Sequence, residues 1–149
     1  MSFKFGQKSL DRLSECHEDL QKIAHELIKE MDVTVLCGFR GKEEQEQAFI
    51  QGKSKLRWPH SKHNKKPSLA MDIVPYPVDW NDMRRFIDMC SAIERIAKSL
   101  DIKILLGRDF SFRDWPHCEL VTDYDIRTGY YERIQKKIQK TPLVYKKRS

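Results

Sequence analysis

Apolar residues recur along this chain at two kinds of spacing, and the longer repeats predict helices. Between residues 9 and 31 they lie three or four positions apart, on one stripe of a helix that also carries His17. The stripe comprises Leu10, Leu13, Leu20, Ala24, Leu27 and Met31. A second stripe runs from Met83 to Leu100, with Asp79 or Asn81 available as its N-cap. The pattern therefore predicts two long amphipathic helices.

Shorter apolar runs between these stripes predict strands. They are rich in β-branched residues or bounded by Gly and Pro, and they cover residues 33–37, 70–74, 102–106 and 117–121. A Glu- and Gln-rich segment over residues 42–52 predicts a short helix closed by Gly52, and one more helix is expected after Thr122. We expect an α+β fold with a small, mostly antiparallel sheet and helices packed on one face.

Strand alternation brings several polar residues of the predicted sheet together. Successive strand residues point to opposite faces, so Asp72 shares a face with Ala70, while His117 shares one with Glu119. The intervening residues then point into the core. Asp72 and His117 are thus expected side by side, with His63 arriving from the preceding loop.

Length and composition limit the class of protein. The 149 residues suit one domain over residues 1–149, with a core of about 3–122 and a C-terminal helix and basic tail over 123–149. No apolar run approaches the roughly 20 residues that span a bilayer, so membrane insertion is not expected. The N-terminus lacks a secretory signal pattern, which predicts a cytoplasmic product. The scattered cysteines predict free, buried thiols at Cys16, Cys37, Cys90 and Cys118.

The charge of the chain favours anionic partners without identifying one. The formal net charge is +6, and basic residues are concentrated near the C-terminus. Nucleic acid and an anionic cell-wall polymer are both candidates, as is a solvated basic surface without a partner. Because no nucleic-acid recognition motif or aromatic stacking platform is present, we do not expect nucleic-acid binding.

Two separated segments carry residues suited to a catalytic metal. The first holds His63 and Asp72, and the second holds Asp114, His117 and Glu119. Two imidazoles and one carboxylate with an open fourth position are typical of catalytic zinc, whereas structural zinc is usually closed by four ligands. A spare acid beside them would accept a proton from water. This combination indicates a small zinc hydrolase.

These segments resemble the zinc peptidases that include phage L-alanyl-D-glutamate endolysins and VanY-type D-Ala-D-Ala carboxypeptidases. That group carries S-x-H-x-x-G-x-A-x-D and, later, D/E-x-P-H-F-E. The matching residues are Ser61, His63, Ala70, Asp72, Asp114, Pro116, His117 and Glu119. Upstream, Gly38-Phe39-Arg40, Gln45 and Gly52-x-Ser54 match further elements. The chain departs from the group in its nine-residue His-to-Asp spacing, in Pro67-Ser68 where Gly is usual, and in Cys118 where Phe is usual.

The resemblance implies a role for each matching residue and a hedgehog/D-Ala-D-Ala peptidase-like fold. The implied ligands of a single zinc ion per chain are His63, Asp72 and His117. Asp114 is then the catalytic acid/base and Arg40 steadies the oxyanion. Gln45 and Ser61 are implied to lie near the substrate. Glu119 either orients a ligand or lies exposed beside it.

The implied activity is hydrolysis of a peptide bond in the murein stem peptide, with L-Ala–D-Glu as the expected bond. A D,D- or L,D-carboxypeptidase is the main alternative, and a non-catalytic basic binding module is a further one. The resemblance also implies a phage endolysin that acts as a monomer on peptidoglycan stem peptides. It would be made in the host cytoplasm and reach the cell wall after holin-type release.

Overall fold

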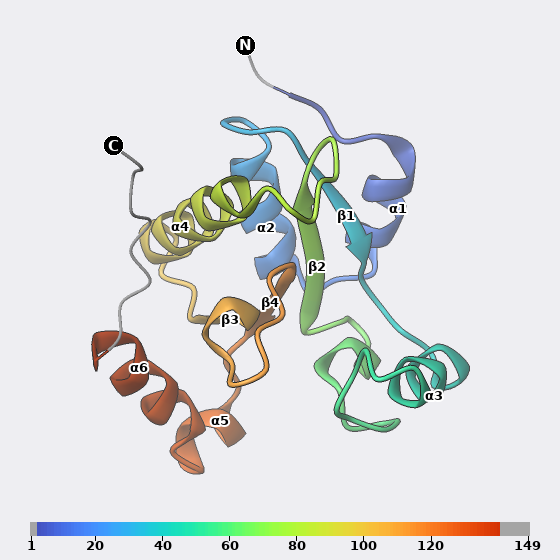
Figure 1. Ribbon diagram of the computed structural model, residues 1–149, viewed down its shortest axis with the longest axis vertical. Coiled ribbons are helices and arrows are strands. Elements are labelled where there is room, and N and C mark those ends of the chain that lie inside the picture. Colours follow the sequence, from blue (N-terminus) through green and yellow to red (C-terminus); the bar gives the residue numbers. More distant parts are fainter. Residues whose placement is uncertain (1–2, 141–149) are drawn as a thin grey trace.

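A four-stranded antiparallel sheet lies at the centre of the computed structural model, which describes residues 3–140 (Figure 1). Its strand order is β1-β2-β4-β3. In chain order the elements are α1 Gln7–Ser14, α2 Glu18–Leu27, β1 Val33–Cys37, α3 Lys42–Ile50, η1 Lys62–Asn64, β2 Ala70–Pro75, α4 Met83–Ser99, β3 Ile104–Leu106, η2 Gly107–Asp109, β4 His117–Leu120, α5 Asp123–Arg127 and α6 Tyr130–Lys140. The predicted α+β class and mostly antiparallel sheet are confirmed.

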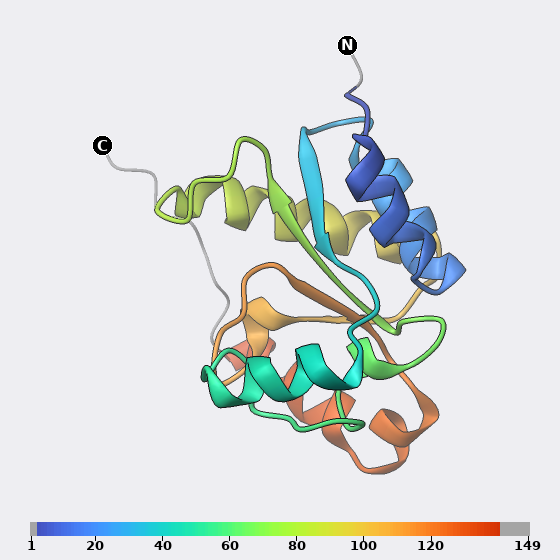
Figure 2. The same cartoon turned by 90° about the vertical axis from the view of Figure 1, so that its right-hand side faces the viewer.

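The apolar face of the sheet packs against α2 and α4. These helices contact each other, and between them they contact β2, β3 and β4. Figures 1 and 2 show α1, α2 and α4 grouped at one end of the molecule, with α3, α5 and α6 toward the other. The largest fully buried side chains of this core are Leu20, Ile23, Leu27, Met71, Ile73, Phe86, Met89 and Ile93. The core thus fixes β2 and β4, which carry the polar residues of interest on their other face.

The prediction of one helix over residues 9–31 is wrong, because the chain breaks between α1 and α2. Cys16 forms an isolated bridge with Ser68, and His17 N donates to the Ser68 carbonyl at 2.8 Å. The His17 ring accepts from Asp19 N at 3.0 Å and so caps α2. The His17 N–H, which a continuous helix would use, is therefore bonded to Ser68. Hydrophobic periodicity does not reveal such a long-range pairing.

Two further helix boundaries differ from expectation. Asp82, rather than Asp79 or Asn81, caps α4 by accepting from Arg85 N. After Thr122 there are two helices instead of one, since the chain turns at Gly129 with φ of 77°. The predicted basic tail over residues 141–149 lies outside the described residues, and the single-domain organisation stays a prediction.

The strand register confirms the predicted pairing of polar residues. Asp72 lies opposite His117, and Ala70 lies opposite Glu119. The pairing of β1 with β2 shifts between Val35 and Cys37, which places Cys37 opposite Asp72. Cys37 is therefore half-buried on the polar face, whereas the other three cysteines are buried free thiols as expected. Among the described residues, no helix is long and apolar enough to cross a membrane.

Candidate active site

Three elements bring His63, Asp72 and His117 together. His63 lies in η1, Asp72 in β2 and His117 in β4. Asp72 Oδ1 lies 3.3 Å from His63 Nε2 and 3.4 Å from His117 Nδ1. The two imidazole rings meet edge to face, with centroids 5.2 Å apart. One carboxylate oxygen thus contacts a nitrogen of each imidazole.

The separation of His63 Nε2 from Asp72 Oδ1 suits metal ligands better than hydrogen-bonded partners. Within residues 3–140, His63 Nε2 and Asp72 Oδ1 are buried and have no hydrogen-bond partner, although buried polar atoms are normally paired. Ligand atoms placed about 2.0–2.1 Å from a tetrahedral metal lie about 3.3 Å from one another. The orphaned atoms and their spacing therefore fit a small metal ion.

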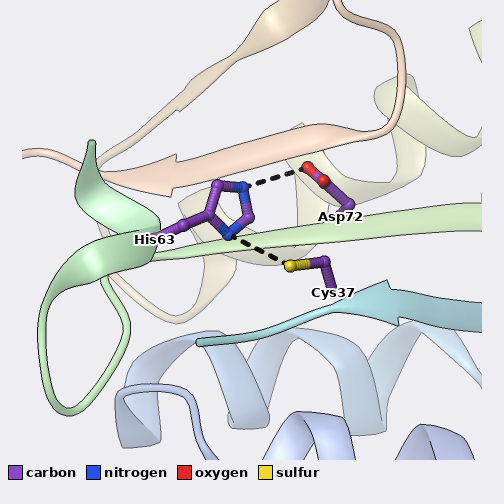
Figure 3. A group of neighbouring side chains, drawn as sticks. All are labelled: Cys37, His63 and Asp72. Carbon is purple, nitrogen blue, oxygen red and sulfur yellow. Dashed lines mark hydrogen bonds and ion pairs between the residues drawn. The ribbon is translucent and has the colours of Figure 1, made fainter. Parts of the chain in front are cut away.

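The orientation of the His63 ring is fixed by the loop after β1. Its Nδ1 donates to the Gly38 carbonyl at 2.8 Å, which leaves Nε2 directed at Asp72. Figure 3 shows the Cys37 sulfur on the Nδ1 side of the ring, 3.8 Å away, and Asp72 on the opposite side. Because one ring nitrogen faces Cys37 and the other faces Asp72, a single ion bound by Nε2 is not shared with the Cys37 side of the ring.

The His117 ring is oriented by Glu119. Its Nε2 lies 2.7 Å from Glu119 Oε1, so that this nitrogen donates to the carboxylate and Nδ1 is left to face Asp72. Glu119 is buried, so the alternative of an exposed Glu119 is wrong. A carboxylate or carbonyl on the second ring nitrogen is the usual way to orient a metal-ligating imidazole. Both imidazoles meet that condition.

Candidate metal ligands in the described part of the chain form two triplets that share Asp72. One contains Cys37 and His63, and the other contains Asp114 and His117. The sequence does not predict Cys37 at the site, because strict alternation from Val35 would point the Cys37 side chain into the core. Only the register shift in β1 places it beside His63.

The charges around Asp72 are arranged to attract a cation. Burial of His63 opposes its protonation, but the Asp72 carboxylate outweighs burial and raises the pKa of His63 to about 10. Burial also opposes protonation of His117, yet contacts with Asp72 and Glu119 raise its pKa to about 9. Burial would raise the pKa of Asp72, but the two imidazoles hold it well below its usual range. A divalent ion bound between these residues would have to displace the imidazole protons that Asp72 favours.

Asp114 lies at the open side of this cluster. Its Oδ2 is 4.0 Å from His117 Nδ1, and its side chain is 43% exposed, the most accessible carboxylate of the group. Partial burial and the neighbouring Asp72 charge raise the pKa of Asp114. A raised pKa makes this carboxylate a better proton acceptor than an ordinary aspartate.

Comparison with known proteins assigns the family. The phage L-alanyl-D-glutamate peptidase family matches residues 1–129. The chain belongs to this family. A curated relative, the L-alanyl-D-glutamate peptidase of Escherichia phage T5, is 34% identical over 125 residues, which are 80% of this chain and 90% of the relative. The crystal structure of Serratia marcescens L-Ala D-Glu endopeptidase ChiX superimposes with a TM-score of 0.69 at 22% identity, over 79% of this chain and 90% of that one.

Arg40, part of the G-x-R element of the family, approaches the cluster from the loop after β1. One of its terminal nitrogens lies 3.6 Å from Asp72 Oδ2, and the other donates to Gln45 Oε1 at 3.1 Å. The Arg40 side chain is 18% exposed. Arg40 is thus held in place by two partners beside the Asp72 carboxylate.

Gln45 and Ser61 are buried and bonded within the protein. Gln45 Nε2 donates to Ser54 Oγ and to the Leu56 carbonyl, so this residue ties the loop after α3 to Arg40. Ser61 Oγ caps η1 by accepting from His63 N at 3.2 Å. Both residues therefore support the elements that carry Arg40 and His63. Contact of either residue with substrate stays a prediction.

Gly107 sets the position of Asp114. Asp114 N donates to the Gly107 carbonyl at 2.9 Å, and a Cβ added at Gly107 would lie 2.0 Å from the Asp114 carbonyl oxygen. We expect Gly107→Ala to displace Asp114 and to lower turnover by about 10²-fold, the usual cost of misplacing a catalytic group by about 1 Å. Steady-state kinetics on a soluble stem peptide measure this effect.

The matched control for Gly107→Ala is Gly6→Ala, where an added Cβ would meet nothing within 4 Å. That variant should retain wild-type turnover. Wild-type turnover in Gly107→Ala would show that the position of Asp114 does not depend on close contact with this turn.

Proposed function

We propose that the chain is a zinc-dependent peptidoglycan peptidase that hydrolyses the L-Ala–D-Glu bond of the murein stem peptide. The observation that supports this most directly is the pair of orphaned buried atoms, His63 Nε2 and Asp72 Oδ1, in a member of a peptidase family. The ligands in this proposal are His63 Nε2, Asp72 and His117 Nδ1, with one zinc ion per chain. Zinc, when bound, supplies Lewis acidity toward a peptide carbonyl and makes water easier to deprotonate.

In the proposed mechanism the remaining side chains handle protons and charge. Asp114 accepts a proton from the attacking water and passes it to the leaving amine, which its raised pKa favours. Arg40 donates from its planar fork to the developing oxyanion. Glu119 is not proposed as the base, because one of its oxygens contacts His117 and the other contacts Lys62.

The bond that is cut distinguishes this proposal from its main alternative. We expect digestion of purified sacculi to release fragments with a new N-terminal D-Glu, identified by mass spectrometry of the soluble products. Release of free D-Ala instead would assign a D,D- or L,D-carboxypeptidase. A zinc-loaded protein that binds sacculi without releasing either product would be a non-catalytic binding module.

The assembly state and the site of action are further parts of this proposal. We propose that the protein acts as a monomer on stem peptides and reaches the cell wall from the host cytoplasm after holin-type release. Sedimentation at micromolar concentration tests the first statement. Lysis from within, with and without a co-expressed holin, tests the second.

A further inference from the structure

The side chain of Lys62 connects the two halves of the site. Lys62 directly precedes His63 in the chain, yet its ammonium group contacts Glu119, the residue that orients the His117 ring. Its Nζ contacts Glu119 Oε2 and donates to Asp125 Oδ2 at 2.6 Å and to the Leu120 carbonyl at 2.7 Å. An ammonium group has three N–H donors, so all of them have a partner here.

Through Glu119, Lys62 is connected to the proposed metal ligand His117. Glu119 uses Oε2 for Lys62 and Oε1 for His117 Nε2. Asp125 also accepts from Thr122 N at 2.8 Å, which anchors it at the start of α5. The side chains of this path are 17% exposed at Lys62 and 10% or less at Glu119, Asp125 and His117. Little water is therefore available to replace any one of them.

Removal of the Lys62 charge would leave Glu119 and Asp125 as neighbouring buried carboxylates without a cation. A buried carboxylate that loses its cationic partner moves toward solvent or toward another donor. Such a movement would release Glu119 from His117. The imidazole could then rotate or take the other tautomer, with its proton on the nitrogen that faces Asp72.

We propose that Lys62 is a positioning residue for the metal centre, which acts through Glu119 to hold His117 with Nδ1 directed at the ion. This inference rests on the proposed metal site. Lys62 is expected to touch neither substrate nor metal. Its effect should therefore appear in the binding of metal, while catalysis by the metal-saturated enzyme changes little.

The test compares Lys62→Met with Lys65→Met in the full-length protein. Lys65 is exposed three positions away, and its Nζ donates to the Pro59 carbonyl at 3.4 Å. Zinc affinity is measured by competition with a chromophoric chelator, and the Co²⁺ absorption spectrum reports ligand geometry. We expect Lys62→Met to bind zinc about 10- to 100-fold more weakly, as is typical for loss of an outer partner of a ligand. Lys65→Met should match wild type, and excess zinc should restore kcat to Lys62→Met.

A second pair of variants separates positioning from general stabilisation. In a Glu119→Gln background, Lys62→Met should change zinc affinity by less than about two-fold, because the residue through which Lys62 acts has already been altered. If Lys62→Met does not fold, Lys62→Gln takes its place under the same criteria.

Three results would overturn the inference. They are unchanged zinc affinity in the Lys62 variant, an equal loss in both backgrounds, or a loss of kcat that excess zinc does not restore. Failure of wild type and Lys65→Met to bind zinc would instead overturn the proposed metal site and this inference with it.

Discussion

Asp114→Asn should lower turnover of a soluble stem peptide by about 10²-fold or more while zinc content and fold are retained. The amide has nearly the shape of the carboxylate but cannot accept the proton from water. Asp114 is the most accessible carboxylate of the cluster, and it lies at its edge, 4.0 Å from His117 Nδ1. The loss should therefore appear in kcat rather than in zinc content measured by elemental analysis.

Asp88→Asn is the matched control for this change of charge. Asp88 is 61% exposed on α4, where it pairs with Arg84, and it lies outside the proposed catalytic machinery. Its turnover should equal that of wild type. Near wild-type activity in Asp114→Asn would assign the base to another group.

His63→Ala and His117→Ala should each remove most of the bound zinc and nearly all activity. Each imidazole offers one nitrogen to Asp72 Oδ1, and each is oriented through its other nitrogen. Elemental analysis after gel filtration should give close to one zinc per wild-type chain and far less for either variant. His25→Ala, on the exposed side of α2, should keep its zinc. Retention of stoichiometric zinc by the His63 or His117 variant would contradict the ligand set.

Zinc affinity of the wild-type protein should rise with pH through neutrality. Ligating imidazoles must be neutral, and in the metal-free site the pKa of His63 is raised to about 10 and that of His117 to about 9. Protons thus compete with zinc at pH 7, although ordinary histidines would be mostly neutral there. Zinc affinity therefore increases with pH, since raising the pH removes the competing protons. Isothermal titration in buffers of different ionisation enthalpy should show protons released on zinc binding. Affinity that does not vary between pH 6 and pH 8 would contradict the raised pKa values.

The central part of the site could be predicted from sequence because strand alternation is a strict geometric rule. A two-residue period puts Asp72 on one face of β2 and His117 on one face of β4, and the observed register pairs them. What could not be predicted depends on irregular or long-range backbone geometry. The shift in β1 that turns Cys37 toward His63 leaves no mark in the hydrophobic pattern.

Residues that act through side-chain networks were also beyond sequence reasoning. Lys62 occupies the unspecified middle position of the Ser-x-His element, and nothing in composition distinguishes it from its lysine neighbours. Its role depends on Asp125, 63 positions later, in the first turn of α5. Likewise, the break between α1 and α2 depends on pairing with Ser68. The periodicity of a segment predicts the structure of that segment alone. The Lys62–Asp125 contact and the break between α1 and α2 both depend on residues far away in the sequence.

A metal ion bound by this cluster would also affect the stability of the fold. The described part of the chain contains no disulfide, and its four cysteines are free thiols. A metal ion bound by His63 and His117 would join points 54 residues apart in the chain (117 − 63). The unfolded chain does not hold these ligands together, so binding of the ion would add to the stability of the folded state. The same ion would then take part in catalysis and stabilise the fold, so a chelator would lower both the activity and the free energy of unfolding.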